Sequence, residues 1–329
     1  MTALLEDKAL PAHQGLSLTR PAAEDTRCLL GTDTPGAKSH WLACMDASNL
    51  AGKDALLGRL GFSEQDGEVR LVEWIHPELA IVSTGEGALH LVSLSPSNQL
   101  AIHGKLPEIH KATLRELAIN QGNRAQFAAG GYDRGLTLVD LERPEAFRKL
   151  EQTGVIGSVA WPGWNQGICP SLTLDDGTLL IYDTRVGGAI PPAFKATFGK
   201  KDLFAHARYS DTNLFVGFGD GEIQHIDNRV TDRILHRFQD PYCLAVGHLE
   251  YHPARNLLLV SGIPDLTVWR VDKATATASP VCHFGSGEAP LSGDTQVNAT
   301  FTESGDVLAA GTAGTLSRIT LSEPGTAGL

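Results

Sequence analysis

The feature that most restricts the fold of this chain is a strand-like motif that recurs at nearly constant spacing. Each copy is a Gly or Asp followed by alternating apolar residues, as in the stretch Gly135 to Leu141. The copies begin at Gly87, Gly135, Gly177, Gly221, Asp265 and Gly314, and their spacings are 48, 42, 44, 44 and 49 residues. Short strands that repeat every 40–45 residues or so are typical of the blades of a β-propeller.

Each repeat contains further short apolar runs before the motif, so we predict four strands per unit. The dipeptides Asp176-Gly177 and Asp220-Gly221 suit tight hairpin turns between two of these strands. Six clear units run from about residue 69 to 322, and a seventh, irregular unit occupies residues 24 to 66. Its predicted strands are Cys28–Gly31, Ser39–Met45 and, outermost, Leu56–Phe62.

The chain length suits one closed ring of seven blades, because seven units of about 44 residues leave only a short leading segment. We expect Leu16–Thr19 to pair with the last blade and close the ring, which removes free strand edges. The predicted organisation is an N-terminal segment (1–23) with the ring-closing strand, a seven-bladed propeller (24–322) and a C-terminal tail (323–329). The predicted fold is therefore all-β, without a second domain.

Composition excludes several classes of function. The chain has 27 Lys+Arg against 38 Asp+Glu and a net charge of -11, which argues against nucleic-acid binding. No apolar run is long enough for a membrane-spanning helix, and Glu6, Asp7 and Lys8 stand where a signal peptide would be apolar. Five widely spaced cysteines without a C-x-x-C pair fit a reducing compartment. An acidic surface suits a basic protein partner.

Several recurring residues resemble those of WD40 repeats. An Asp ends the third strand of four units, where WD40 repeats carry their Trp-Asp pair, and Asp183-Thr-Arg185 is a common variant of that pair. The pairs His76-Pro77 and His252-Pro253 also recur in that superfamily. The strict Trp-Asp pair is absent, and the Gly-His pair occurs only as Gly247-His248. The four aspartates are Asp140, Asp183, Asp227 and, more loosely, Asp272.

Within that superfamily, the order of features resembles the WD-repeat adaptor of the methylosome, the partner of the type II protein arginine methyltransferase. Leu29-Leu30-Gly31 followed by Trp41 is similar to the first blade of that family, and Glu73-Trp74 follows in the family's order. The stretch Phe215 to Gly221 resembles its fifth blade. The resemblance implies a WD40-like propeller that binds the methyltransferase and presents basic substrates, namely histones and spliceosomal Sm proteins.

Searches for catalytic chemistry find little. The sequence has no H-E-x-x-H, G-x-S-x-G or Walker motif, and the glycines between Gly217 and Gly221 precede a strand, as hairpin glycines do. Twelve histidines are scattered without ligand spacing. We therefore predict no enzymatic activity, no catalytic residue, no metal and no cofactor. Three or more buried polar side chains converging in the central channel would favour the alternative of a propeller hydrolase.

Trp41 is the leading candidate for contact with a partner, together with His40 and Lys38 beside it. It follows the short polar loop Thr32 to His40, and an exposed indole is a strong interface anchor. In the adaptor family, the matching Trp inserts into a pocket of the methyltransferase. The alternative is that Trp41 begins an inner strand and packs between blades. Trp164 is a second candidate anchor, whereas Trp74 and Trp269 are predicted to pack within strands.

Acidic residues at the blade turns are candidates for binding the Arg/Lys-rich tails of substrates. They are Glu86, Asp133, Asp175 and Asp220. The alternative is ordinary surface charge, which keeps a protein soluble.

The sequence thus predicts a non-catalytic WD40 adaptor in a hetero-oligomer with a protein arginine methyltransferase, binding basic proteins such as histones. Neither nucleic acid nor membrane is expected as a direct partner. The expected location is the cytoplasm, with the nucleus as a second compartment. The alternative is a WD40 scaffold of another assembly, namely a nuclear pore, a ubiquitin ligase or a ciliary complex, because the fold alone does not separate these.

Overall fold

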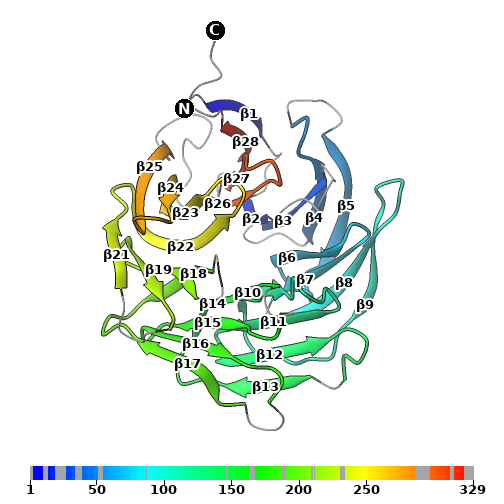
Figure 1. The fold of residues 1–329 in the computed structure, drawn as a ribbon. Helices are drawn as coiled ribbons and strands as arrows, with labels where there is room; N and C mark the ends of the chain where they lie inside the picture. The colour runs from blue at the N-terminus through cyan, green and yellow to red at the C-terminus, as the bar shows by residue number, and fades with distance from the viewer. Residues whose placement is uncertain are drawn as a thin grey trace.

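The fold is a ring of seven antiparallel sheets around a central axis (Figure 1). The computed structural model describes residues 3–9, 14–18, 27–33, 39–50, 55–85, 87–145, 147–163, 167–186, 190–208, 210, 212–229, 234–285, 297–311 and 315–321. These residues form seven four-stranded sheets and no α-helix, so none of them lies in a helix able to cross a membrane. The predicted all-β, seven-bladed propeller is confirmed, and it is consistent with a WD40-type fold.

The strands of blades 1 to 4 follow one another in chain order. Blade 1 contains β2 (Gln14–Leu18), β3 (Arg27–Asp33), β4 (Ser39–Asp46) and β5 (Leu56–Ser63). Blade 2 contains β6 (Val69–His76), β7 (Leu79–Thr84), β8 (Ala88–Leu94) and β9 (Leu100–Lys105). Blade 3 contains β10 (Leu114–Ile119), β11 (Gln126–Gly131), β12 (Gly135–Asp140) and β13 (Arg148–Glu151). Blade 4 contains β14 (Ile156–Ala160), β15 (Ser171–Leu174), β16 (Thr178–Tyr182) and β17 (Pro192–Thr197).

Blades 5 and 6 repeat this order, and blade 7 combines both ends of the chain. Blade 5 contains β18 (Leu203–Arg208), β19 (Asn213–Phe218), β20 (Glu222–Asp227) and β21 (Ile234–Gln239). Blade 6 contains β22 (Cys243–His252), β23 (Leu257–Pro264), β24 (Leu266–Asp272) and β25 (Thr277–Phe284). Blade 7 contains β26 (Val297–Phe301), β27 (Val307–Gly311), β28 (Thr315–Leu321) and β1 (Ala3–Ala9).

The first strand of each blade lies at the centre of the ring, and the fourth lies at the rim (Figure 1). Because neighbouring strands are antiparallel, the link from one blade to the next lies on the same face as the turn between second and third strands. We call this face the linker face. The turns between first and second strands, and between third and fourth strands, lie on the opposite face.

The ring is closed by an N-terminal strand, as predicted, but the predicted segment is wrong. Closure is made by β1, whose residues Ala3 to Ala9 pair with Leu321 to Thr315 of β28. In the segment predicted to close the ring, Leu16–Thr19, the described residues 16–18 instead belong to β2, the innermost strand of blade 1, which pairs with β3. Only three strands had been predicted for the irregular blade 1. The remaining strand is β2, which precedes those three along the chain.

The predicted hairpin turns at Gly177 and Gly221 also hold neighbouring blades together. Both glycines have positive φ, 86° and 82°, which suits residues without a side chain. A Cβ at Gly177 would lie 1.8 Å from the Lys200 carbonyl oxygen, and one at Gly221 would lie 2.3 Å from that of Cys243. In each turn, glycine therefore allows the backbone of the next blade to approach closely.

The core lies between the blades. Seven hydrophobic clusters occupy the seven contacts between neighbouring blades. One of them joins Leu30 and Met45 of blade 1 to Leu308 and Leu316 of blade 7, where the ring closes. Burial of apolar area at every junction is the main favourable term for the closed ring.

The aspartates that suggested WD40 repeats have a shared structural role. Each carboxylate accepts the backbone N–H of the residue two positions later, in the turn between third and fourth strands. Asp183 and Asp227 also pair with Arg185 and Arg229 at 2.5 Å. The Gly247-His248 pair lies inside the central strand β22. The predicted packing roles of Trp74 and Trp269 are confirmed, since both are buried.

Candidate functional site

Trp41 lies on the third strand of blade 1, near the linker face. Its indole is half-buried and lies across Gly61 of β5, where an added Cβ would be 3.2 Å from the ring. The Arg59 guanidinium lies 4.6 Å from the centre of the indole. Trp41 belongs to none of the seven hydrophobic clusters of the described residues, so its ring is not sealed between blades. An indole with an arginine on its face is a suitable anchor for a partner.

The other predicted partner contacts are placed differently. His40 is 9 % exposed, so the structure puts its side chain inside blade 1. Lys38 and Trp164 lie outside the described residues. Trp161, three residues before Trp164, is buried. Its Nε1 donates to the Gly167 carbonyl oxygen at 2.5 Å. Trp41 is thus the one predicted anchor whose partial exposure the described structure shows.

The structure brings three of the predicted acidic residues to the linker face. Asp133, Asp175 and Asp220 occupy the turn between second and third strands of blades 3, 4 and 5. Glu86 lies outside the described residues. The repeat predicted this common position, because residues at the same place in successive blades lie on the same face of the ring.

Each of these three aspartates already has partners within the protein. Asp133 accepts hydrogen bonds from His110 Nδ1 and Lys149 Nζ, both at 3.1 Å. Asp175 accepts the backbone N–H of Val155 at 2.9 Å. Asp220 pairs with Lys200 at 2.5 Å, which keeps the pKa of its carboxyl below the usual value although partial burial opposes this. These contacts tie turns to neighbouring links and strands, and the proposed binding of tails remains a prediction.

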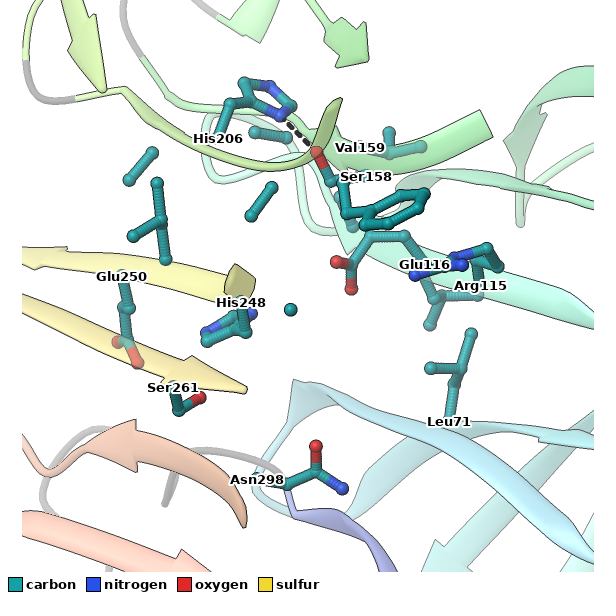
Figure 2. Close-up of a pocket in the computed structure, with 18 of the residues that line it drawn as sticks. Leu71, Arg115, Glu116, Ser158, Val159, His206, His248, Glu250, Ser261 and Asn298 are labelled. Atoms are coloured by element: carbon teal, nitrogen blue, oxygen red, sulfur yellow. Dashed lines mark hydrogen bonds between the residues drawn. The ribbon is translucent and has the colours of Figure 1, made fainter. Parts of the chain in front are cut away.

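The central channel is a cavity of about 770 Å³, lined mainly by the innermost strands. Figure 2 shows the side chains of Glu116 (blade 3), His248 (blade 6) and Asn298 (blade 7) directed into the same space. Ser158, His206 and Ser261 are buried in its wall. The sequence left a propeller hydrolase as an alternative, and a convergence of buried polar side chains in the channel was the feature expected to favour it.

The Ser–His contact in the channel wall is unsuited to nucleophilic catalysis. Ser158 Oγ lies 2.6 Å from His206 Nδ1, and Ser171 Oγ lies 2.8 Å from His206 Nε2. Burial, together with the nearby Arg208 charge, lowers the pKa of His206 to about 3. A general base that activates serine works best with a pKa near 7. We interpret the pair as a structural contact between blades 4 and 5.

Glu116 and His248 have pKa shifts in opposite directions, and each shift favours the uncharged form of the side chain. Burial raises the pKa of Glu116 to about 7, although the Leu117 N–H and Arg115 favour the carboxylate. Burial lowers the pKa of His248, and the neighbouring Glu250 opposes this shift. No group of three or more His, Cys, Asp or Glu side chains in the described residues is placed to hold a metal ion.

We expect the low pKa of His206 to make the protein less stable in acid. The unfolded chain binds a proton at His206 below about pH 6.5, whereas the native chain does so only near pH 3. Stability is therefore lost as the pH falls through this window, by about 1.4 kcal/mol per pH unit from this group. Urea unfolding at several pH values should show a shallower decline for His206→Asn than for the unchanged protein.

The control for this experiment is His76→Asn, because His76 is exposed. Glu116, with its raised pKa, contributes the opposite slope between about pH 4.5 and 7, so slopes are compared between variants. An equal slope in His206→Asn and His76→Asn would contradict the assignment.

Sequence reasoning did not identify Glu116 or Asn298 as site residues, and it treated the histidines as scattered. A signal was present in the strand Leu114 to Ile119, where Arg115 and Glu116 interrupt the apolar pattern. Such an interruption identifies a polar position but does not show which way its side chain points. Only the closed ring brings residues 116, 248 and 298 to one cavity.

Comparisons with known proteins give no family. No protein-family model matches the chain, and no curated protein is similar to it in sequence. The function is therefore inferred from the fold, from the surface around Trp41 and from the acidic turns of the linker face.

Proposed function

We propose that this protein is a non-catalytic adaptor that binds a protein partner through the Trp41 surface, defined as Trp41, Arg59 and Gly61. The observation that carries the proposal is the partly exposed Trp41, whose indole lies against Gly61 with the Arg59 guanidinium over its ring. A seven-bladed propeller fits a scaffold or adaptor, because its rigid ring holds several surfaces in constant relative positions. Trp and Arg are the residue types most enriched in binding hot spots.

The partner we propose is a protein arginine methyltransferase, on the basis of the resemblance in blade 1. The net charge of -11 supports basic substrates such as histones and spliceosomal Sm proteins. To bind their tails, the aspartates of the linker face would exchange present partners such as Lys149 and Lys200 for the cations of the tail. The adaptor would act by tethering, since a second weak contact raises the local concentration of substrate at the enzyme. The complex would be a hetero-oligomer of the cytoplasm and nucleus.

The second candidate is a scaffold of another assembly, such as a nuclear pore, ubiquitin ligase or ciliary complex. The same fold and the same anchor support it, so the identity of the partner distinguishes the two. Affinity purification from the source cells followed by mass spectrometry should recover a type II arginine methyltransferase if the first candidate is correct. Stoichiometric recovery of another assembly would replace it.

We expect Trp41→Ala to abolish co-purification with the partner while the circular dichroism spectrum stays unchanged. Truncating a central hot-spot residue typically costs about 2 kcal/mol or more of binding free energy, which is about thirtyfold in affinity. Titration of purified proteins should show this loss. The matched control is Leu56→Ala, because Leu56 is 47 % exposed in the same blade as Trp41. Unchanged binding by Trp41→Ala would contradict the docking proposal.

A further inference from the structure

The central channel contains a carboxylate that no other side chain of the described residues pairs. Glu116 projects from β10 into the cavity (Figure 2), where the backbone N–H of Leu117 donates to its carboxylate and the charge of the adjacent Arg115 favours it without a hydrogen bond. Partial burial of a carboxylate without a cation is unfavourable, and folding alone gives no reason to keep one. An unpaired group of this kind in a cavity is a candidate binding residue.

The arginines that line the same cavity do not compensate Glu116. Arg70 pairs with Glu68 beside it, and Arg208 donates to the Cys169 carbonyl oxygen at 2.6 Å. The Arg115 guanidinium lies over aromatic rings at the mouth of the channel, 4.8 Å from the centre of Phe204 and 5.7 Å from that of Tyr132. No arginine of the cavity wall in the described residues therefore forms an ion pair with Glu116.

The mouth of the channel on the linker face has an apolar rim. Tyr132 and Ile263 line the cavity and are 53 % and 47 % exposed, and Leu244, beside Ile263, is 69 % exposed. Exposed large apolar residues gathered at the opening of a cavity are typical of a binding site. Inside, Ser261 Oγ is buried without a hydrogen-bond partner in the described structure, and His248 lies opposite Glu116.

We propose that the channel binds an organic cation, namely an ammonium or guanidinium group on an apolar body. The apolar body contacts Tyr132, Ile263 and Leu244 at the rim, and the cationic group reaches Glu116 in the channel. The cation is either a free amine or the Lys or Arg side chain of a protein segment, since the chemistry is the same. This site is separate from the Trp41 surface and does not depend on the partner proposed there.

Calorimetric titration of the full chain tests the proposal with two pairs of probes. The first pair is 2-phenylethylamine and 2-phenylethanol, which differ in the charge of the head group. The second pair is a capped peptide Ala-Leu-Arg-Leu-Ala and the same peptide with citrulline in place of arginine. If free amines are ligands, 2-phenylethylamine and the arginine peptide should each bind at least tenfold more tightly than the neutral probe of the same pair. Binding of the arginine peptide alone would identify a protein segment as the source.

The variant that tests the site is Glu116→Gln, which keeps the shape of the side chain and removes the charge. We expect it to reduce the affinity for the cationic probe at least tenfold while its melting temperature at pH 8 rises, because a buried charge is removed. Glu142→Gln, in an exposed turn, is the matched control and should leave binding unchanged. Unchanged affinity in Glu116→Gln, or no binding of any probe up to about 10 mM, would overturn the proposal.

Proton release gives a second readout that a merely structural role would not produce. Glu116 is partly protonated near pH 7, so a bound cation should drive its ionisation. The release is measured as a dependence of binding enthalpy on the buffer, and it should disappear in Glu116→Gln. The other charged or titratable groups of the cavity are Arg70, Glu73, Arg115, Tyr132, His206, Arg208, His248, Glu250 and Tyr251. Trp41→Ala should leave this binding unchanged, so failure here is distinguishable from failure of the docking proposal.

Discussion

Deleting residues 1–9 should open the ring and remove most of the stability of the protein. The deletion takes away β1, which pairs with β28 through seven residues, and leaves β28 as an exposed edge strand. A seven-residue antiparallel pairing contains about seven backbone hydrogen bonds, so at about 1 kcal/mol net for each bond the cost is about 7 kcal/mol. Small domains have only about 5–15 kcal/mol of stability, so the loss is a large fraction of the total.

Urea unfolding and size-exclusion chromatography measure this effect. We expect a lower midpoint of unfolding and self-association of the deleted protein, because an unpaired edge strand invites pairing with another chain. A synthetic peptide of residues 1–11 added in trans should restore the midpoint, and a scrambled peptide should not. Unchanged stability of the deleted protein would show that the hydrophobic cluster between blades 1 and 7 is sufficient to close the ring.

Asp240→Ala should be the most damaging single substitution that we consider. Asp240 is 3 % exposed, in the link between blades 5 and 6. One carboxylate oxygen accepts hydrogen bonds from Thr267 Oγ1 and from Trp269 Nε1, the latter at 3.1 Å. The other oxygen accepts the backbone N–H groups of Tyr242 and Cys243, at 2.9 and 3.1 Å. Alanine removes this acceptor from four donors, of which Trp269 Nε1 keeps a hydrogen bond to Thr267 Oγ1 at 3.2 Å.

Each buried donor left without its acceptor costs about 1–3 kcal/mol, so we expect a total loss of about 4 kcal/mol in the free energy of unfolding. The matched control is Asp272→Ala. Asp272 also accepts two backbone N–H groups, those of Ala274 and Thr275, but it is exposed. The control should lose about 1 kcal/mol or less. Equal losses in the two variants, measured by urea unfolding, would contradict a special role for the buried network.

Much of the fold was predictable from the spacing of one strand motif. The copies from Gly87 to Gly314 predicted six blades, and the runs at residues 28–31, 39–45 and 56–62 predicted three strands of blade 1. The assignment of the closing strand was wrong. Both N-terminal segments are short and strand-like, and local sequence does not say which of them pairs with residues 300 positions away.

The candidate sites, like the fold, were predictable only in part. The repeat predicted that Asp133, Asp175 and Asp220 share one face, because equivalent positions in successive blades are equivalent in space. It did not predict that Asp133 and Asp220 are already paired with Lys149 and Lys200, or that Asp175 accepts the Val155 backbone N–H. The half-burial of Trp41 depends on Gly61 and Arg59 of the neighbouring strand, whose register no local pattern reveals.

The sequence by itself determined the all-β class, the number of blades and the acidic character, because strand period, turn residues and charge are local or additive properties. Only the tertiary structure decided which strand closes the ring, how far Trp41 is exposed and that Glu116 faces His248 and Asn298 across one cavity. The physical reason is that closing the ring brings together residues from blades far apart in the chain. Their contacts depend on the geometry of the whole circle, and no segment of the sequence contains that information.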